Sequence, residues 1–188
     1  MPITNGYATL VDVKAELRLT TTTDDTRLER CVETASRFID LLAGRVFYAP
    51  GVTVSEVAGT GTDTIFVRDS ANVTLVQESL TGLSTYVTVP ATGWYTPFVD
   101  DRPITRIIRS LGAVWARGGR VRVTSNLQWS GATPKPIETA TLIEAVRLFK
   151  RPDSPEGVLA GDFGAARLAR VDPDVLALVR PYKRRVLG

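Results

Sequence analysis

Few residues in this sequence could carry catalytic chemistry, and their spacing forms no catalytic centre. The 188 residues include no histidine and a single cysteine, Cys31. The absence of histidine excludes Ser-His-Asp and Cys-His centres and the common His-containing zinc sites. One cysteine allows no internal disulfide framework, and its place on an apolar helical stripe indicates a buried structural thiol. We therefore expect no enzymatic activity, no metal and no cofactor.

The acidic residues give no general acid–base pair. Two adjacent pairs occur, at residues 24–25 and 100–101, and neighbours in sequence point apart on a helix or strand. A Pro- and Gly-rich stretch after residue 151 carries more acids, but their spacing fits no calcium-binding loop. We expect this stretch to be a loop that becomes ordered on assembly. Its candidate residues are Asp153, Glu156, Gly157, Gly161, Asp162, Phe163 and Gly164.

Arginines gather in two segments that could bind a partner. An alternating stretch places Arg120 and Arg122 on one strand face, with Arg117 nearby. That face is either solvated or in contact with DNA phosphates or an acidic neighbouring subunit. No helix-turn-helix, zinc or RNA-binding signature supports base-specific readout.

The C-terminal segment is the second basic one. It is either a solubilising terminus or a docking peptide, and we favour docking because tyrosine and arginine are enriched in interfaces. Its candidate docking residues are Arg180, Tyr182, Lys183, Arg184 and Arg185.

Composition and charge describe an ordinary globular chain with an uneven charge distribution. The chain is 44% hydrophobic and 23% charged. No apolar run reaches the roughly 18 residues of a membrane helix, and the N-terminus lacks a signal-peptide pattern; we expect assembly inside a cell and no membrane partner. Residues 1–100 carry 7 basic and 12 acidic side chains, a net of −5, and residues 101–188 carry 16 and 8, a net of +8. Such asymmetry indicates contact with nucleic acid, an acidic surface or another copy.

Periodicity predicts helices at both ends of the chain. Leu10–Leu17 follows a Thr9/Asp12 capping box, and a second helix runs from residues 24–25 to a Gly44 stop. A third helix follows Pro136, placed at its first position, and is apolar nearly all round, which predicts burial. A short helix capped by Asp172 closes the pattern.

The middle of the chain reads as strands. Residues 59–63 look like a hairpin connection, because no helix or Gly-Lys-Ser/Thr follows as in a phosphate loop. We predict an α+β fold: a helical core of residues 1–45 and 134–188, and an inserted antiparallel β module of residues 46–133, a sandwich or small barrel. The predicted strands are Val52–Val57, Thr64–Arg68, Val73–Gln77, Tyr86–Val89, Ile104–Arg109 and Arg120–Leu127.

The order of these motifs resembles the head–tail connector (adaptor, or head-completion) proteins of tailed bacteriophages. The segments that carry the resemblance are Tyr7–Leu17, residues 24–25 with Ala43–Arg45, Trp129–Gly131 with Pro136, Gly157–Gly164, Leu168, Asp172–Val175 and Pro181–Arg184. Compact members of that family are almost all helical, so the β module is a departure.

The resemblance implies a ring, usually of twelve copies, beneath the portal vertex of the capsid. Such a ring extends the channel for double-stranded DNA, bound without sequence preference, and meets the stopper or tail-end neck protein. It implies location in the virion after assembly in the host cytoplasm. The alternatives are another neck protein, a stopper or tail-completion protein, and a small nucleic-acid-binding accessory protein of DNA packaging.

Overall fold

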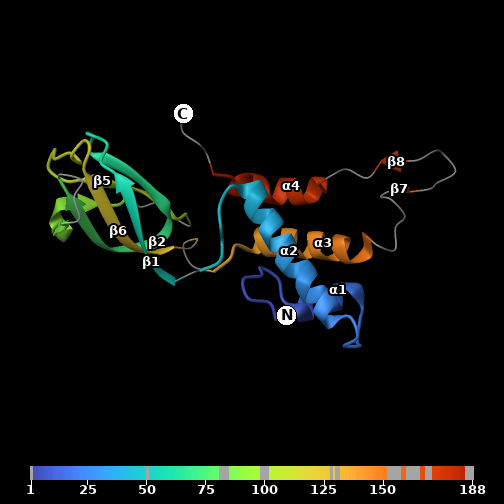
Figure 1. Ribbon diagram of the computed structural model, residues 1–188. Helices are drawn as coiled ribbons and strands as arrows, with labels where there is room; N and C mark the ends of the chain where they lie inside the picture. Colours follow the sequence, from blue (N-terminus) through green and yellow to red (C-terminus); the bar gives the residue numbers. More distant parts are fainter. Residues whose placement is uncertain are drawn as a thin grey trace. The chain divides into compact units, whose positions relative to one another are not determined.

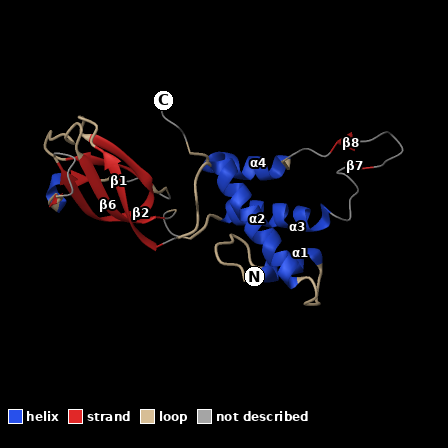
Figure 2. Cartoon of the chain, in the orientation of Figure 1, coloured by secondary structure: helices blue, strands red, loops and turns tan. Residues whose placement is uncertain are grey.

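The chain folds into two units, one helical and one built on a sheet. The computed structural model describes residues 2–49, 51–80, 85–97, 102–127, 129, 132–151, 158–159, 166–167 and 171–184. One unit comprises Met1–Phe47 with Thr133–Gly188, and the other is Tyr48–Ala132. Figure 2 shows the α-helices in the first unit and the large sheet in the second. The predicted α+β class is confirmed.

The first unit is built around one central helix. Within the described residues its α-helices are α1 (Leu10–Leu17), α2 (Asp25–Ala43), α3 (Lys135–Lys150) and α4 (Pro173–Val179), followed by the 3-10 turn η4 (Arg180–Tyr182). Helix α3 contacts each of the other three (Figure 1). The predicted burial of this apolar helix thus comes from α1, α2 and α4 of the same chain.

Local signals set the helix ends. The Thr9 hydroxyl accepts a hydrogen bond from the Asp12 amide at 3.1 Å, and the Thr9 amide donates to Asp12 Oδ2 at 3.4 Å. The predicted capping box is therefore present. Gly44 ends α2 with φ of 66°, a left-handed conformation that glycine adopts without a Cβ penalty. Asp172 caps α4 through the Asp174 amide at 2.9 Å. The prediction that Pro136 takes the first position of α3 is wrong by one residue, because Lys135 precedes it in the helix.

The helical core is small and apolar. Its buried members include Val13 of α1, Leu28 and Val32 of α2 and Ala145 of α3. Cys31 packs at the margin of this cluster and is half-buried. Burial raises the pKa of the Cys31 thiol, although nearby arginines act in the opposite sense. The thiolate is therefore disfavoured, but the prediction that Cys31 is buried is wrong in degree, because the side chain is only half-buried.

The second unit is one antiparallel sheet with a bent long strand. The strands are β1 (Gly51–Ala58), β2 (Thr64–Ser79), β3 (Val87–Thr88), β4 (Trp94–Tyr95), β5 (Ile104–Arg109) and β6 (Arg120–Leu127). A 3-10 turn, η1 (Ala91–Gly93), precedes β4. The sheet order is β1-β6-β2-β5-β4, and β3 also pairs with β2.

Two predictions about this sheet are wrong. The strands predicted at Thr64–Arg68 and Val73–Gln77 form the single strand β2, because its pairing register shifts at bulges between Phe66 and Leu75 and no turn interrupts it. Ser70 holds this bend: its hydroxyl lies 3.0 Å from the Ser125 hydroxyl of β6. The loop at residues 59–63 is not a hairpin connection, since β6 lies between β1 and β2.

The core of the sheet unit forms on one face. Ile65, Val76, Ile107 and Val123 are fully buried there with Trp115. A further two-stranded pair, β7 (Val158–Leu159) with β8 (Ala166–Arg167), lies between α3 and α4 in the sequence. Among the described residues, no helix has the length and hydropathy needed to cross a bilayer.

Candidate docking surfaces

The first half of the basic C-terminal segment is anchored to the helical unit. The Tyr182 ring meets the Phe47 ring edge-on, with centroids 6.2 Å apart. The Arg184 amide donates to the Ala43 carbonyl at the end of α2, at 2.8 Å. Arg180 and Lys183 are exposed, and Arg185 lies outside the described residues. The segment therefore leaves the fold at a fixed point beside the end of α2.

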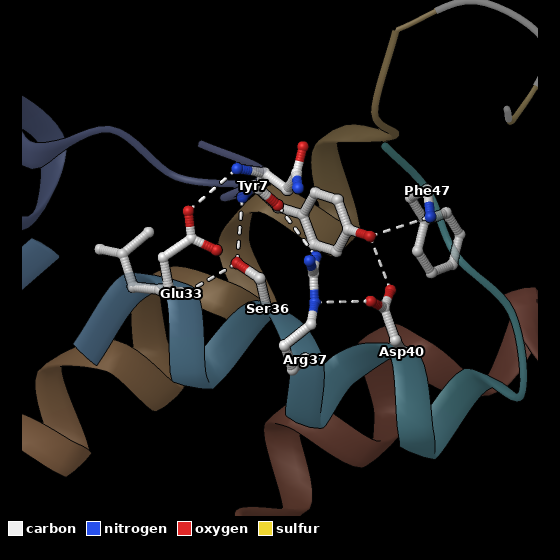
Figure 3. Close-up of polar contacts among 8 residues, drawn as sticks. Tyr7, Glu33, Ser36, Arg37, Asp40 and Phe47 are labelled. Carbon is white, nitrogen blue, oxygen red and sulfur yellow. Dashed lines mark hydrogen bonds and ion pairs between the residues drawn. The ribbon is translucent and has the colours of Figure 1, made fainter. Parts of the chain in front are cut away.

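Tyr7 is the centre of a group of contacts next to this anchor, which we call the junction (Figure 3). The junction consists of Tyr7, Ser36, Arg37, Asp40 and Phe47. Its hydroxyl donates to Asp40 Oδ1 at 2.6 Å and accepts from the Phe47 amide at 2.9 Å. The Tyr7 and Phe47 rings pack edge-to-face at 5.8 Å. One tyrosine thus ties the N-terminal segment to α2 and to the residue on which Tyr182 rests.

Side chains of α2 complete the junction. Arg37 Nε pairs with Asp40 Oδ2 at 2.9 Å, and Arg37 Nη2 donates to the Asn5 carbonyl at 2.9 Å. The Ser36 hydroxyl accepts from the Tyr7 amide at 3.1 Å. Figure 3 shows these groups converging from α2 on the N-terminal segment.

The chemistry of the junction is structural. Burial raises the pKa of the Asp40 carboxyl, while Tyr7, Arg37 and the Phe47 amide oppose that shift by hydrogen bonds and charge. Tyr7 and Arg37 occupy the carboxylate oxygens. The described residues contain no cluster of three or more His, Cys, Asp or Glu that could hold a metal ion. The geometry suits an anchor for a segment, not a site of bond making.

The structure brings Arg120 and Arg122 together on the outer face of β6 but partly offsets their charge. Arg122 Nη2 and Nε both donate to Glu56 Oε1 of β1, at 2.7 and 3.2 Å. Arg120 Nη1 lies 3.8 Å from Glu56 Oε2. The hydrogen bond from Arg122 lowers the pKa of Glu56, which keeps that carboxylate ionised.

Two further contacts define this face. The Arg122 guanidinium lies 3.9 Å from the centroid of the Tyr86 ring, in cation–π geometry. Arg117 lies in the loop before β6, and its side chain runs close to Gly61, where an added Cβ would come within 3.3 Å of it. Arg120 and Arg122 therefore share the Glu56 carboxylate, Arg122 also contacts Tyr86, and Arg117 lies beside Gly61, so the three arginines do not form one bare cationic surface.

The seven candidate residues of the assembly loop, from Asp153 to Gly164, lie outside the described residues. The sequence does not predict a contact role for several residues of the docking surfaces: Tyr7, Asp40, Phe47, Glu56 and Tyr86. The available signal for Glu56 was the strand alternation of residues 51–58, which places it outward. Its pairing with Arg122 depends on the β1–β6 register, for which the sequence offers no local signal.

Comparison with known proteins finds relatives in fold only. No family model and no curated protein matches the sequence. A chain from the neck of an empty GTA particle, computed with C6 symmetry, aligns with a TM-score of 0.64 and 20% identity over 100% of this chain and 95% of that chain.

Two further solved chains agree. One, from the virion of a native gene transfer agent (GTA) particle, gives a TM-score of 0.61 and 20% identity, covering 95% of this chain and 91% of that one. The other, from the neck of a native GTA particle computed with C12 symmetry, gives 0.55 and 23%, covering 95% and 93%. The similarity spans both units, so the sheet unit belongs to the shared fold.

Proposed function

We propose that this chain is a structural protein of a virion neck. Its specific role would be that of a head–tail adaptor, which forms a ring between the portal and the next neck protein. One observation carries the proposal: the fold matches a chain from the neck of a GTA particle over 100% of this chain and 95% of that chain. An alignment that leaves almost nothing out on either side favours a shared architectural role over a borrowed domain.

The oligomer we propose is a closed ring with the number of copies set by the neck. The matched neck structures were computed with C6 and C12 symmetry, and twelve copies satisfy both. A closed ring needs a heterologous contact, in which two different surfaces of the same chain meet. Such a protein needs no catalytic group, consistent with a junction made of satisfied structural contacts.

The anchored C-terminal segment supports a docking role towards the portal. Tyr182 and Arg184 fix where the segment leaves the helical unit. A fixed exit point reduces the conformational entropy that docking must overcome. Exposed Arg180 and Lys183 then present charge beside that point.

In the proposed ring, the chain would contact the double-stranded DNA that passes through the channel. Channel DNA requires weak contact without sequence preference, and the Glu56 carboxylate beside Arg120 and Arg122 moderates what would otherwise be a strong phosphate site. The same observation disfavours the alternative of a dedicated nucleic-acid-binding accessory protein.

The test separates the anchor from the residues beyond it. One variant ends after Arg184 and keeps every described contact of the segment; a second carries Tyr182→Ala and loses the ring contact with Phe47. We expect both to lose head–tail joining, measured as the fraction of tailed particles in electron micrographs, while Lys150→Ala at the end of α3 serves as control.

A structure of the assembled neck would distinguish the adaptor role from the stopper or tail-completion role. A map of the assembled neck should place this chain in direct contact with the portal. A map that places it one layer further from the capsid would favour the stopper or tail-completion role. A tailed fraction unchanged in both tail variants would refute the docking role of the segment.

A further inference from the structure

The sheet unit carries a second exposed basic surface, on strands other than β6. We name it the aromatic–arginine face: Phe66 and Arg68 of β2, Tyr95 of β4, and Arg106 and Ile108 of β5. Phe66 is 57% exposed and Tyr95 51%, and both arginines are exposed. The sequence signal was the alternation Ile65-Phe66-Val67-Arg68, in which the two aliphatic residues are buried.

Strand register places Phe66, Tyr95, Arg106 and Ile108 on one face, and the alternation of exposed and buried residues along β2 places Arg68 there as well. Phe66 of β2 lies opposite Arg106 of β5. Tyr95 of β4 lies opposite Ile108 of β5. Residues directly opposite each other in an antiparallel pair project on the same side. The opposite side holds the buried core, as the Ile65–Ile107 pair shows.

The two arginines of this face differ from those of β6 in being uncompensated. Within the described part of the chain, neither Arg68 nor Arg106 forms an ion pair or a ring contact. Two exposed aromatics with two uncompensated guanidinium groups form a surface typical of protein interfaces, where aromatic residues and arginine are enriched. Duplex DNA would use the charges but not the aromatics, because its bases are stacked inside the helix.

A complementary surface is present on the same chain. We name it the acidic face of α1: Val11, Asp12, Ala15 and Glu16. Val11 is 75% exposed, and the other three are exposed as well. Val11 and Ala15 stand one helical turn apart and share a side, as do Asp12 and Glu16. The surface therefore offers apolar contact with two carboxylates.

Two lysines near the acidic face of α1 are already engaged: Lys14, and Lys135 of α3, which interacts with Asp12 but pairs with Glu138 at 2.6 Å. Lys14 of the same helix pairs with Asp25 of α2 at 2.7 Å, so its charge is offset within the unit. Asp12 also serves the Thr9 cap, which fixes its position without removing its negative charge.

We infer that the aromatic–arginine face binds the acidic face of α1 of a second copy of this chain. The inference rests on the proposed ring, because a heterologous contact requires two different, complementary surfaces on one chain. Arginines of one copy would meet the carboxylates of the next, while Phe66 and Tyr95 cover Val11 and Ala15. Each copy then contacts one neighbour through its aromatic–arginine face and the other neighbour through its acidic face of α1.

Cross-linking between two kinds of full-length chain tests this contact. Both kinds carry Cys31→Ser; one adds Ala15→Cys on α1, the other Thr64→Cys, which lies opposite Ile108 on the aromatic–arginine face. Mixed under oxidising conditions, they should form a disulfide heterodimer. The control replaces Ala15→Cys by Ala177→Cys on the exposed side of α4.

Charge reversal makes the test specific. Arg68→Glu with Arg106→Glu in the Thr64→Cys chain should lower the cross-link yield roughly tenfold, because like charges then oppose each other. Adding Glu16→Arg to the Ala15→Cys chain should recover it. Arg68→Lys with Arg106→Lys keeps the charges and should keep the cross-link. Circular dichroism and tryptophan fluorescence confirm that each variant is folded.

Three results would overturn the inference: equal yields with the Ala177→Cys control, no effect of the charge reversal, or loss of the cross-link on adding duplex DNA. The last would assign the face to DNA. The ring itself is judged separately from the neck map. A specific cross-link without a ring in that map would refute the proposed function and leave the contact standing, and a ring without the cross-link would do the reverse.

Discussion

Two ion pairs of the sheet unit have nearly the same length but different burial, and they should differ sharply in their effect on stability. Arg109 Nη2 lies 2.6 Å from Glu78 Oε2, with side chains 18% and 6% exposed. Arg122 Nη2 lies 2.7 Å from Glu56 Oε1, with side chains 37% and 39% exposed. Glu78 also accepts from the Ala116 amide at 2.8 Å.

Glu78→Ala leaves the Arg109 guanidinium in a buried site without its carboxylate. Removing one partner of a buried pair costs about 3–5 kcal/mol, because the remaining charge has lost both water and partner. Glu56→Ala removes a carboxylate that water already surrounds, so the free energy of unfolding should stay close to that of the unmodified chain. Because the lengths match, the two pairs differ in burial and in the second hydrogen bond of Glu78, from the Ala116 amide.

Tryptophan fluorescence reports this unit selectively. All three tryptophans of the sequence, Trp94, Trp115 and Trp129, lie within Tyr48–Ala132, and the Arg109 guanidinium lies 4.7 Å from the Trp115 ring. Urea unfolding followed by fluorescence gives the free energy of the sheet unit, while circular dichroism at 222 nm follows the helices.

A double variant tests whether the orphaned Arg109 charge causes the loss of stability. If the cost of Glu78→Ala comes from an orphaned charge, then Glu78→Leu combined with Arg109→Leu should recover part of the loss. Equal destabilisation by Glu78→Ala and Glu56→Ala would refute the argument from burial. A double variant no more stable than Glu78→Ala would show that the loss comes from packing instead.

Two predictions concern the helical unit. Tyr7→Phe removes the hydrogen bonds that the hydroxyl makes with Asp40 and the Phe47 amide. It should lower the free energy of unfolding by about 1–3 kcal/mol, because buried groups lose their partner. Circular dichroism in urea measures this change, and an unchanged unfolding midpoint would contradict the prediction. Burial raises the pKa of Glu144 in α3, with Arg147 opposing, so the folded state binds the proton more tightly and stability falls as pH rises through the interval between the ordinary and the raised pKa. Glu144→Gln should therefore stabilise the chain at neutral pH and remove part of that pH dependence, whereas a stability loss at pH 7 would show that the ion pair with Arg147 outweighs burial.

Local signals were sufficient for the helices but not for the sheet. The capping box at Thr9, the glycine at residue 44 and the cap at Asp172 each act within a few residues, so the sequence predicts them directly. The sequence predicts two strands where β2 is one, because residues 69–72 are small and mostly polar, which is typical of a turn. The chain instead bulges there, since Ser70 finds a partner on β6, 55 residues away.

The sequence predicts which residue types form the docking surfaces, but it does not predict the contacts that these residues make. The basic C-terminal segment was visible in the sequence, but its anchoring depends on Phe47, far away in the chain. Strand alternation predicted that Arg120 and Arg122 share a face, and it could not supply the carboxylate of Glu56, which the register of a different strand provides. Pairings between distant segments carry no local signature, and these pairings decide which charges remain available.

The charge asymmetry between the two halves of the sequence does not correspond to the two structural units. Residues 1–47 with 133–188 carry 16 basic and 14 acidic side chains, a net of +2, and residues 48–132 carry 7 and 6, a net of +1. The difference between sequence halves therefore does not separate one unit from the other, and neither unit as a whole attracts a polyanion strongly. Electrostatic recognition must then act between individual faces. A contact between Arg68 and Arg106 of one copy and Asp12 and Glu16 of the next is recognition of that kind, and it should weaken with added salt while its apolar part persists.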